Sequence, residues 1–400
     1  MKFLGKRRLL NLISSSIAST REVDLRGVKI CHLSPVQGRD ERVFRREALP
    51  ASEFGIRETI IGPHGERGRI EGIEFVPLAQ KRNRALRILL ASKGVVPALR
   101  QRADIYHVHS PEHIVTGLIL KFLFRKRVIY DSREDFPAMM LNKTYLPSRL
   151  RRWAKNLVFQ AERSAALCFD GFVTADPGSL RPHAKSGSSK KLVFYNLPNL
   201  RFFPDLDGQT KRFDLVYRGG LSERAGTFVL LDAVHLLMTE GLPVRLLIFG
   251  YTDTGTVRHK IKEHIRMLQI EDLVTLGGVI PHTQMAATLA QARVAVCPLR
   301  RIPKFLNNLP VKVFESWACG LPVIATDLPP IRPFFSRSQE GLLVRPGDPR
   351  SLARAIRTLL DRPDEIERIG KEARQMTLTR YNNGREFRKL LSFYRSVLAT

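Results

Sequence analysis

Acidic residues are scarce in this sequence relative to basic ones. The 400 residues include 38 Asp and Glu but 66 Lys and Arg, which gives a formal net charge of +28. The excess is largest in the first half, because residues 1–200 hold 36 basic and 18 acidic residues against 30 and 20 in residues 201–400. Such a surplus favours an anionic partner, and nucleic acid and an anionic membrane surface satisfy it equally. A soluble protein of arginine-rich composition is the alternative.

Cysteine is also rare. The four cysteines are scattered along the chain at Cys31, Cys168, Cys297 and Cys319, mostly within apolar runs. Their spacing fits neither a disulfide framework nor a zinc-binding motif. We therefore expect reduced, buried thiols and a reducing cytoplasm as the location of the protein.

Long hydrophobic runs are missing as well. No stretch reaches the ~18–20 uncharged apolar residues needed to span a bilayer. The chain begins "MKFLGKRRLLNLISSS", in which a basic start precedes only the short apolar core "LLNLI". That core is shorter than the one in a usual export signal. We expect a basic, amphipathic extension and no export.

Short apolar runs alternate with longer segments of helical spacing. One series of expected strands and helices covers residues 28–33, 58–62, 83–101, 104–109, 113–124, 127–132 and 171–175. A second series covers residues 213–219, 227–240, 244–250, 273–278, 294–299, 322–327, 341–346 and 348–362. Apolar strands separated by helices predict buried parallel sheets of the doubly wound kind. The fold class is therefore α/β, with two Rossmann-like domains.

The boundary between the domains is expected in residues 196–211, "NLPNLRFFPDLDGQTK", which are rich in Pro, Asn, Gly and Asp. This places an N-terminal domain at 1–205 and a C-terminal domain at 206–380. Doubly wound sheets bind ligands beyond the carboxyl ends of their strands. Two facing sheets therefore predict a substrate pair in the cleft between domains.

The segment "LPVKVFESWACGLPVIATD", residues 309–327, predicts a short helix followed by a buried strand. Pro310 suits a first helical turn, and Gly320 suits a left-handed helix end. Lys312 and Glu315 then lie near the helix N-terminus, which favours anions. The carboxylate can accept hydrogen bonds from a ribose diol, and the ammonium can meet a phosphate. The alternative is an exposed i, i+3 Lys–Glu pair, worth about 0.2–0.5 kcal/mol.

This segment, followed by "EGLLVRPGDPRSLARAIRTLL", closely resembles the donor-binding half of family-4 retaining glycosyltransferases of the GT-B fold. "YRGGLSERAG" (217–226) is similar to the first strand and phosphate loop of that half, and "HVHSPEH" (107–113) to an N-domain motif. "YDSREDFP" (130–137) and "GRDERVFRRE" (38–47) resemble motifs of a branch that builds bacterial surface polysaccharides. The resemblance implies two facing Rossmann-like domains, with a C-terminal helix, 381–400, that returns to the N-domain.

The resemblance also implies roles on the donor side. Glu315 would hold the ribose hydroxyls of a nucleotide-sugar, UDP- or GDP-linked, while Lys312 faces the donor. Asn307 stands where many members carry a glutamate that contacts the donor sugar. In the phosphate loop, Gly220 stands where the family usually has Arg, and Ala225 stands where it usually has Lys. The nearest cations are then the two arginines of the loop region, Arg224 and Arg218.

On the acceptor side, the resemblance implies that His109 lies near the reacting sugar. Ser110 and Arg133 replace the common Asp and His of the two N-domain motifs, which is expected to affect acceptor choice. The remaining acceptor-side candidates come from the three N-domain motifs and are Gly38, Asp40, Glu112, Glu134 and Asp135. Plainer alternatives are a core histidine for His109 and a solvated loop for the two acidic residues of 130–137.

Retaining transfer needs a cation for the leaving diphosphate and a pocket for an oxocarbenium-like sugar. The sequence offers neither an obvious carboxylate nucleophile nor a D-x-D metal motif. The resemblance therefore implies a metal-independent hexosyltransferase with no cofactor beyond the nucleotide-sugar co-substrate.

The expected acceptor is a glycan or a lipid-linked sugar. Residues 139–159 mix Met, Leu, Tyr and Trp with five cations, as an interfacial segment does. We expect peripheral attachment to the anionic inner face of the cytoplasmic membrane. A catalytically silent GT-B scaffold, a basic nucleic-acid binder and a GT-B sugar epimerase are the alternatives; no recognisable nucleic-acid module accompanies the charge, so no nucleic acid is expected.

Overall fold

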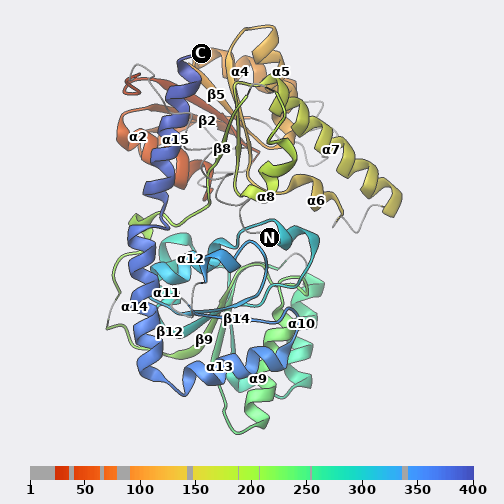
Figure 1. Ribbon diagram of the computed structural model, residues 1–400, viewed down its shortest axis with the longest axis vertical. Coiled ribbons are helices and arrows are strands. Elements are labelled where there is room, and N and C mark those ends of the chain that lie inside the picture. Colours follow the sequence, from red (N-terminus) through yellow and green to blue (C-terminus); the bar gives the residue numbers. More distant parts are fainter. Residues whose placement is uncertain are drawn as a thin grey trace, which may run out of the picture.

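The protein was analysed as a computed structural model that describes residues 23–35, 40–63, 67–78, 91–141, 147–187, 189–206, 208–252, 255–335 and 341–400. Two α/β halves are stacked along the long axis of the molecule, each built around its own sheet (Figure 1). Several features of the sequence lie outside the described residues. These are Gly38, the N-terminal extension with its basic residues at 6–8, the basic residues within 81–87, and part of the helix expected at 83–101.

The N-terminal half contains an eight-stranded sheet in the order β3-β4-β2-β1-β5-β6-β7-β8. All neighbours pair in parallel except β3 and β4, which form an antiparallel edge. The strands are β1 (Lys29–Leu33), β2 (Arg57–Gly62), β3 (Gly68–Ile70), β4 (Ile73–Pro77), β5 (Ile105–His109), β6 (Arg127–Ser132), β7 (Gly171–Thr174) and β8 (Lys190–Val193).

The C-terminal half contains a six-stranded, fully parallel sheet in the order β11-β10-β9-β12-β13-β14. Its strands are mostly apolar, as expected for a parallel sheet that helices cover on both faces. The strands are β9 (Phe213–Arg218), β10 (Leu246–Phe249), β11 (Val274–Gly278), β12 (Ala292–Cys297), β13 (Val323–Thr326) and β14 (Gly341–Val344). The two strand series expected from the sequence are therefore present.

Helices cover the faces of both sheets. In the N-terminal half they are α2 (Leu49–Phe54), α4 (Val95–Arg100), α5 (Ile114–Phe122), α6 (Phe136–Leu141), α7 (Ser148–Cys168), α8 (Pro177–Leu180) and a π-helical turn, η1 (Val43–Ala48). In the C-terminal half they are α9 (Thr227–Thr239), α10 (Gly255–Met267), α11 (Met285–Leu289), α12 (Val311–Ala318), α13 (Pro349–Leu360) and α14 (Pro363–Thr379). Of the helix expected at 83–101, the described part is α4 with a preceding 3₁₀ turn, Ala91–Gly94.

The last helix, α15 (Asn383–Leu398), leaves the C-terminal half and runs along the N-terminal sheet (Figure 1). Phe387, Leu390, Leu391 and Tyr394 share one stripe of the helix and are buried there. They pack with Ile30 and other residues of the N-terminal half in one apolar cluster. The predicted fold class, two facing parallel-sheet domains with a returning C-terminal helix, is confirmed.

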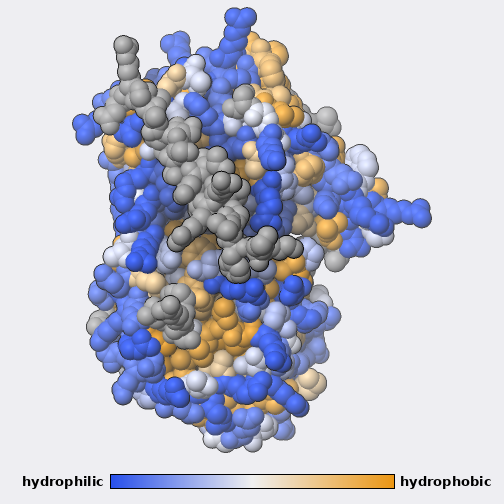
Figure 2. Space-filling model, in the orientation of Figure 1, coloured by the Kyte–Doolittle hydropathy of each residue, from blue (hydrophilic) through white to orange (hydrophobic). Residues whose placement is uncertain are grey.

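Hydrophilic and hydrophobic side chains are distributed unevenly over the surface of the molecule. In Figure 2, hydrophilic side chains cover much of the periphery of this face, and hydrophobic atoms gather in the middle of the C-terminal half. Helices α6 and α7 project sideways from the N-terminal half and carry both kinds of side chain. Among the described residues, we find no helix of the length and apolarity that a membrane span requires.

Candidate functional site

A cavity of about 520 Å³ lies between the two halves. Its wall is built from segments that follow strand ends: residues 133–134 and 175–176 after β6 and β7, and residues 218–225, 249–251 and 279–280 after β9, β10 and β11. Because parallel strands place their carboxyl ends at one edge, these segments converge on the cleft. The charged side chains in the wall are Arg133, Arg218, Arg224, Lys304, Lys312, Glu41, Glu134 and Asp176. Cations therefore outnumber carboxylates in the cavity.

The loop between β9 and α9 lies directly against two neighbouring strand ends. A Cβ atom placed on Gly226, where φ is +78°, would be 1.8 Å from the carbonyl oxygen of Pro298. A Cβ placed on Gly250 would be 1.9 Å from the carbonyl oxygen of Gly219. Only glycine permits these approaches, and they bring backbone rather than side chains to the cavity edge. At Gly220, where the resembling family has an arginine, the ring of Tyr251 lies 3.1 Å from an added Cβ.

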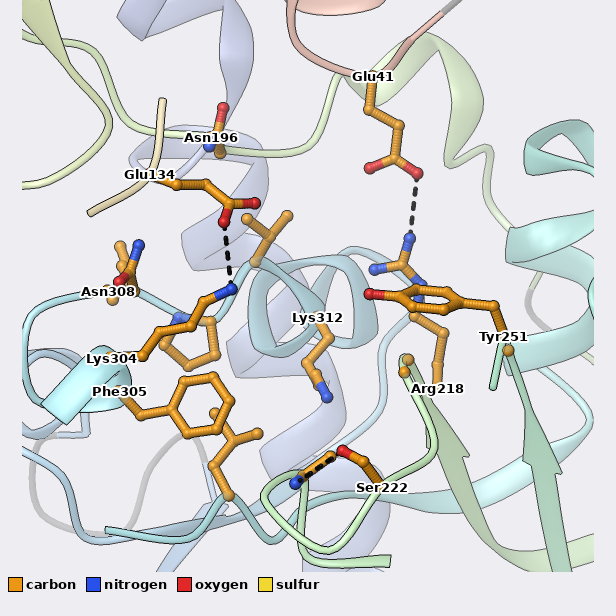
Figure 3. A pocket seen from close by; sticks show the side chains of 18 of the residues that line it. Glu41, Glu134, Asn196, Arg218, Ser222, Tyr251, Lys304, Phe305, Asn308 and Lys312 are labelled. Atoms are coloured by element: carbon orange, nitrogen blue, oxygen red, sulfur yellow. Dashed lines mark hydrogen bonds and ion pairs between the residues drawn. The ribbon is translucent and has the colours of Figure 1, made fainter. Parts of the chain in front are cut away.

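Lys312 projects from the first turn of α12 into the cavity (Figure 3). Its Nζ lies 3.3 Å from the Tyr217 hydroxyl and 4.7 Å from the centre of that ring. Burial disfavours the ammonium, but Tyr217 and Cys297 outweigh burial and raise the pKa of Lys312. The side chain therefore presents a fixed positive charge at a helix N-terminus, where an anion also meets unpaired backbone N–H groups.

Glu315 lies one turn further along α12 and is completely buried. It forms ion pairs with Arg218 at 2.5 Å and with Arg46 of the N-terminal half at 3.3 Å. Burial raises the pKa of Glu315, while Arg218 opposes that shift. The alternative of an exposed pair with Lys312 is therefore wrong. Glu315 does not line the cavity in this conformation, because the two arginines cover its carboxylate.

Glu41 joins the two halves beside Glu315. Its carboxylate pairs with Arg218 at 3.1 Å, shown in Figure 3, and with Arg46 at 3.4 Å. Burial opposes ionisation, but Arg218 and Arg46 together lower the pKa of Glu41. Ligand atoms of Glu41, His282 and Glu315 lie within 4.8 Å of one another. The two arginines already neutralise both carboxylates, so this group is an ion-pair network rather than a metal centre.

The predicted donor and acceptor residues touch across the cleft. Asn307 donates a hydrogen bond to Asp135 at 3.1 Å. Lys304 pairs with Glu134 at the same distance, and Figure 3 shows this pair. Asn307 also lies against the backbone at Gly178, where an added Cβ would be 2.8 Å from the asparagine Cβ. The structure thus brings Asn307, a donor-side candidate, against Asp135, an acceptor-side candidate of the other domain.

The other acceptor-side candidates are distributed differently. Asp40 accepts a hydrogen bond from the backbone N–H of Val43 at 2.6 Å and pairs with Arg133 at 3.3 Å, so it orders the entry to η1. Glu112 lies in the 3₁₀ turn Pro111–His113 after β5, where its backbone N–H donates to the Ser110 hydroxyl, and it does not line the cavity. Arg133 and Arg224 do line it.

His109 lies at the end of β5 and is completely buried. Its Nδ1 is 3.0 Å from Asp131, and its Nε2 is 2.8 Å from Nδ1 of His32. Burial lowers the pKa of His109 to about 3, so the ring is neutral. The residue is not part of the cavity wall.

Sequence reasoning missed several residues of the cleft. Glu41 and Arg46 lie within the quoted motif 38–47, so the motif pointed to this segment. It could not show that these two residues pair with Arg218 and Glu315 of the C-terminal half. Lys304 and Tyr251 lie in loops after strands and belong to no motif. Only the folded chain places them beside Glu134 and Gly220.

Comparisons with known proteins address the C-terminal half. Residues 201–376 match the family model described as "Glycosyl transferases group 1". A glycosyltransferase named for colanic acid biosynthesis, WcaL of Escherichia coli K12, is 28% identical over 180 residues, 44% of this chain and 43% of that protein. The amylovoran biosynthesis glycosyltransferase AmsK of Erwinia amylovora is 26% identical over 171 residues, 42% of this chain and 41% of that protein. The matched segment thus spans less than half of either relative.

Solved structures resemble nearly the whole chain. A sucrose-phosphate synthase from Thermosynechococcus elongatus has a TM-score of 0.76 at 19% identity, covering 93% of this chain and 99% of that one. HepE of Anabaena, solved in complex with UDP-glucose, has a TM-score of 0.70 at 17% identity, covering 92% and 99%. At this identity the likeness shows the fold. The chain has the GT-B fold, and its residues 201–376 are similar to glycosyl transferases group 1 domains.

Proposed function

We propose that the protein is a retaining, metal-independent hexosyltransferase that moves a sugar from a nucleoside-diphosphate sugar to a glycan or lipid-linked acceptor in polysaccharide synthesis. One observation carries the proposal. The cavity between the sheets gathers Arg218, Arg224 and Lys312 beside a glycine-rich loop and the N-terminus of α12. Cations, exposed backbone N–H groups and a helix N-terminus together suit a diphosphate. The volume is also in the usual range for a small-molecule site, roughly 300–1,000 Å³.

In this proposal, Lys312 and Arg224 neutralise the diphosphate as it leaves. Charge develops on that group in the transition state, so fixed cations lower the barrier more than they strengthen ground-state binding. Arg224 supplies the charge that the family places at positions 220 and 225. Tyr251 occupies the space over Gly220 and leaves the backbone of the loop facing the donor.

The proposed roles of Glu315 and Asn307 require exchange of partners. Glu315 would release Arg46 and Arg218 to accept hydrogen bonds from the ribose, and Asn307 would exchange Asp135 for the donor sugar. The contacts of Glu315 with Arg46 and of Asn307 with Asp135 join the two halves, so donor entry is coupled to relative movement of the halves. His109, which lies outside the cavity wall, is proposed to act as a positioning residue held by Asp131.

Membrane attachment is proposed to use the projecting helix α7. Leu150, Trp153 and Leu157 recur along one stripe and are 51%, 65% and 53% exposed. Exposed cations at Arg149 and Arg152 flank them. An apolar stripe edged with cations suits the surface of an anionic bilayer, where each basic group contributes roughly 1 kcal/mol. Sedimentation with phosphatidylserine vesicles should retain the protein at low salt, and L150S/W153S/L157S should reduce retention.

The experiment that tests the function is a thermal-shift screen of the full chain against UDP- and GDP-sugars, followed by a transfer assay with the ligand that stabilises. A donor present at 100 times its Kd should stabilise the protein by about 2.7 kcal/mol. Transfer with retention at the anomeric carbon supports the proposal. Binding without hydrolysis or transfer supports the silent scaffold, and absence of any nucleotide effect contradicts both.

A further inference from the structure

Three histidines and a glutamate meet in the N-terminal half, outside the cavity wall. His32 lies on β1, His107 and His109 lie on β5, and Glu47 comes from η1. Side chains alternate along a strand, so His32, His107 and His109 all point to the face of the sheet that α15 and η1 cover. All four side chains are at most 1% exposed. A cluster of this composition is unexpected in an otherwise apolar core.

The spacing of the four side chains fits a single metal ion. Glu47 Oε2 lies 4.0 Å from His32 Nδ1, 3.6 Å from His107 Nδ1 and 3.7 Å from His109 Nε2, and the His32 and His109 atoms are 2.8 Å apart. A tetrahedral metal with bonds of about 2.0–2.1 Å separates its ligand atoms by roughly 3.4 Å. We propose that His32, His107, His109 and Glu47 bind one divalent first-row metal, with Zn²⁺ as the best match to three imidazoles and one carboxylate.

The second ring nitrogen of two histidines is already oriented by a carboxylate. His32 Nε2 lies 2.9 Å from Glu58, and His109 Nδ1 lies 3.0 Å from Asp131. Metal-binding histidines commonly donate their other N–H to such a partner, which fixes the tautomer and turns the lone pair toward the metal. In this tautomer neither His32 Nδ1 nor His109 Nε2 carries a proton to donate across the 2.8 Å between them, so both lone pairs are available to a metal ion bound beside the two rings.

Unpartnered polar atoms point into the same space. Neither carboxylate oxygen of Glu47 has a hydrogen-bond partner among the described residues, and Arg42 approaches only one of them, at 3.2 Å. Three carboxyl groups, those of Glu47, Glu58 and Asp131, therefore surround the imidazole rings, and Arg42 contacts two of them. A site rich in imidazole and carboxyl groups suits a divalent cation.

Loading replaces two contacts, the one of 3.1 Å between His107 Nδ1 and the Tyr394 hydroxyl and the one of 2.8 Å between His32 Nδ1 and His109 Nε2. In return the metal joins β1 and β5 to η1, the turn that also carries Arg46 against Glu315. The site is therefore structural: it holds the N-terminal side of the domain contact in place. None of its ligands lines the cavity, so this metal does not touch the donor diphosphate. His109 is the one residue that this site shares with the proposed function.

The test is the metal content of the full chain. The protein is purified without a polyhistidine tag from zinc-supplemented cells, dialysed against metal-free buffer and measured by elemental mass spectrometry. The proposal expects about one Zn²⁺ per chain, and H107N should reduce it to near zero. The control is H113N, because His113 is also a buried histidine, and neither of its ring nitrogens has a hydrogen-bond partner among the described residues. That variant should keep its metal.

A second readout covers the case in which H107N does not fold. Protein from cobalt-supplemented cells should show the intense visible absorption of tetrahedral Co²⁺, without any variant. Less than about a tenth of an equivalent of Zn²⁺ together with no cobalt spectrum would overturn the proposal. Equal metal content in H107N and H113N would also overturn it, since the metal would then bind elsewhere.

Discussion

The two halves of the molecule share a sheet architecture but differ in their cores. The C-terminal half has one continuous apolar cluster that includes both sides of its sheet. In the described part of the N-terminal half, the apolar residues divide into three clusters. The polar group around His32, Glu47 and Asp131 lies between the cluster under α15 and the cluster under η1. The C-terminal half is thus held by packing, and the N-terminal half also by buried charge.

The two halves also differ in how far known proteins match them. The family model covers residues 201–376, and the similarity to WcaL and AmsK spans a similar share of the chain. The C-terminal half carries its motifs in continuous segments, a loop and a helix with the strand after it. The buried ion pairs of the N-terminal half join residues far apart in sequence, such as Arg42 and Asp131, and these leave a weaker local signature.

The largest effect is expected from breaking the buried charge of the N-terminal half. Arg42 donates two hydrogen bonds to Asp131, each 2.6 Å long, and further bonds to Phe194 and Asn196. R42M leaves the Asp131 carboxylate buried without its partner, which costs about 3–5 kcal/mol in the free energy of unfolding. Urea denaturation measures this, and the double variant R42M/D131L should recover part of the loss. Equal stability of R42M and the parent would contradict the comparison.

A pH dependence of stability is expected from Glu162. Burial raises its pKa from 4.5 to about 7, although Ser132 and Tyr130 donate hydrogen bonds to it. A raised carboxyl pKa stabilises the fold below pH 4.5, and the contribution is lost as pH rises through 7, a loss on the order of 3 kcal/mol. E162Q mimics the protonated form, so the stability difference between E162Q and the parent should grow from pH 4.5 to pH 8. A difference that stays constant over this range rules the shift out.

A smaller effect, confined to donor binding, is expected from Arg224 in the C-terminal half. R224Q removes one charge-assisted contact to the diphosphate, worth about 1.5–3 kcal/mol, or roughly 10–150-fold in donor affinity. Stability should be unchanged because the side chain lies at the cavity surface. R266Q, on an exposed position of α10, is the matched control. If both variants bind donor alike, the cation that replaces the family's pattern is not Arg224.

The smallest effect is expected at the contact between Lys304 and Glu134. These side chains are 22% and 41% exposed, and such pairs contribute about 0.2–1 kcal/mol. A double-mutant cycle of K304A and E134A should therefore give a coupling below 1 kcal/mol in stability. A coupling well above that would mean that the closed cleft is held shut by this pair rather than by the buried arginines.

The sequence predicted the parts of this molecule that depend on local pattern. Strand and helix order, the returning helix and the position of Lys312 follow from periodicity, glycine placement and motif resemblance. Burial of Glu315 between Arg218 and Arg46 could not be predicted, because Arg46 lies 269 residues away and no local rule pairs them. The histidine cluster could not be predicted for the same reason, because three elements, β1, η1 and β5, must assemble before His32, Glu47 and His109 meet. No hydrophobic periodicity in the sequence predicts the π-helical turn η1.

The central claim is that the C-terminal half binds the donor through the N-terminus of α12. Isothermal titration of the full chain with the UDP- or GDP-sugar selected by the thermal screen tests it most directly, comparing the parent with K312M and with K260M, a control on an exposed position of α10. We predict that K260M binds like the parent, while K312M loses at least tenfold in affinity and keeps its melting temperature within a few degrees. Donor affinity that is equal in all three proteins would contradict the account.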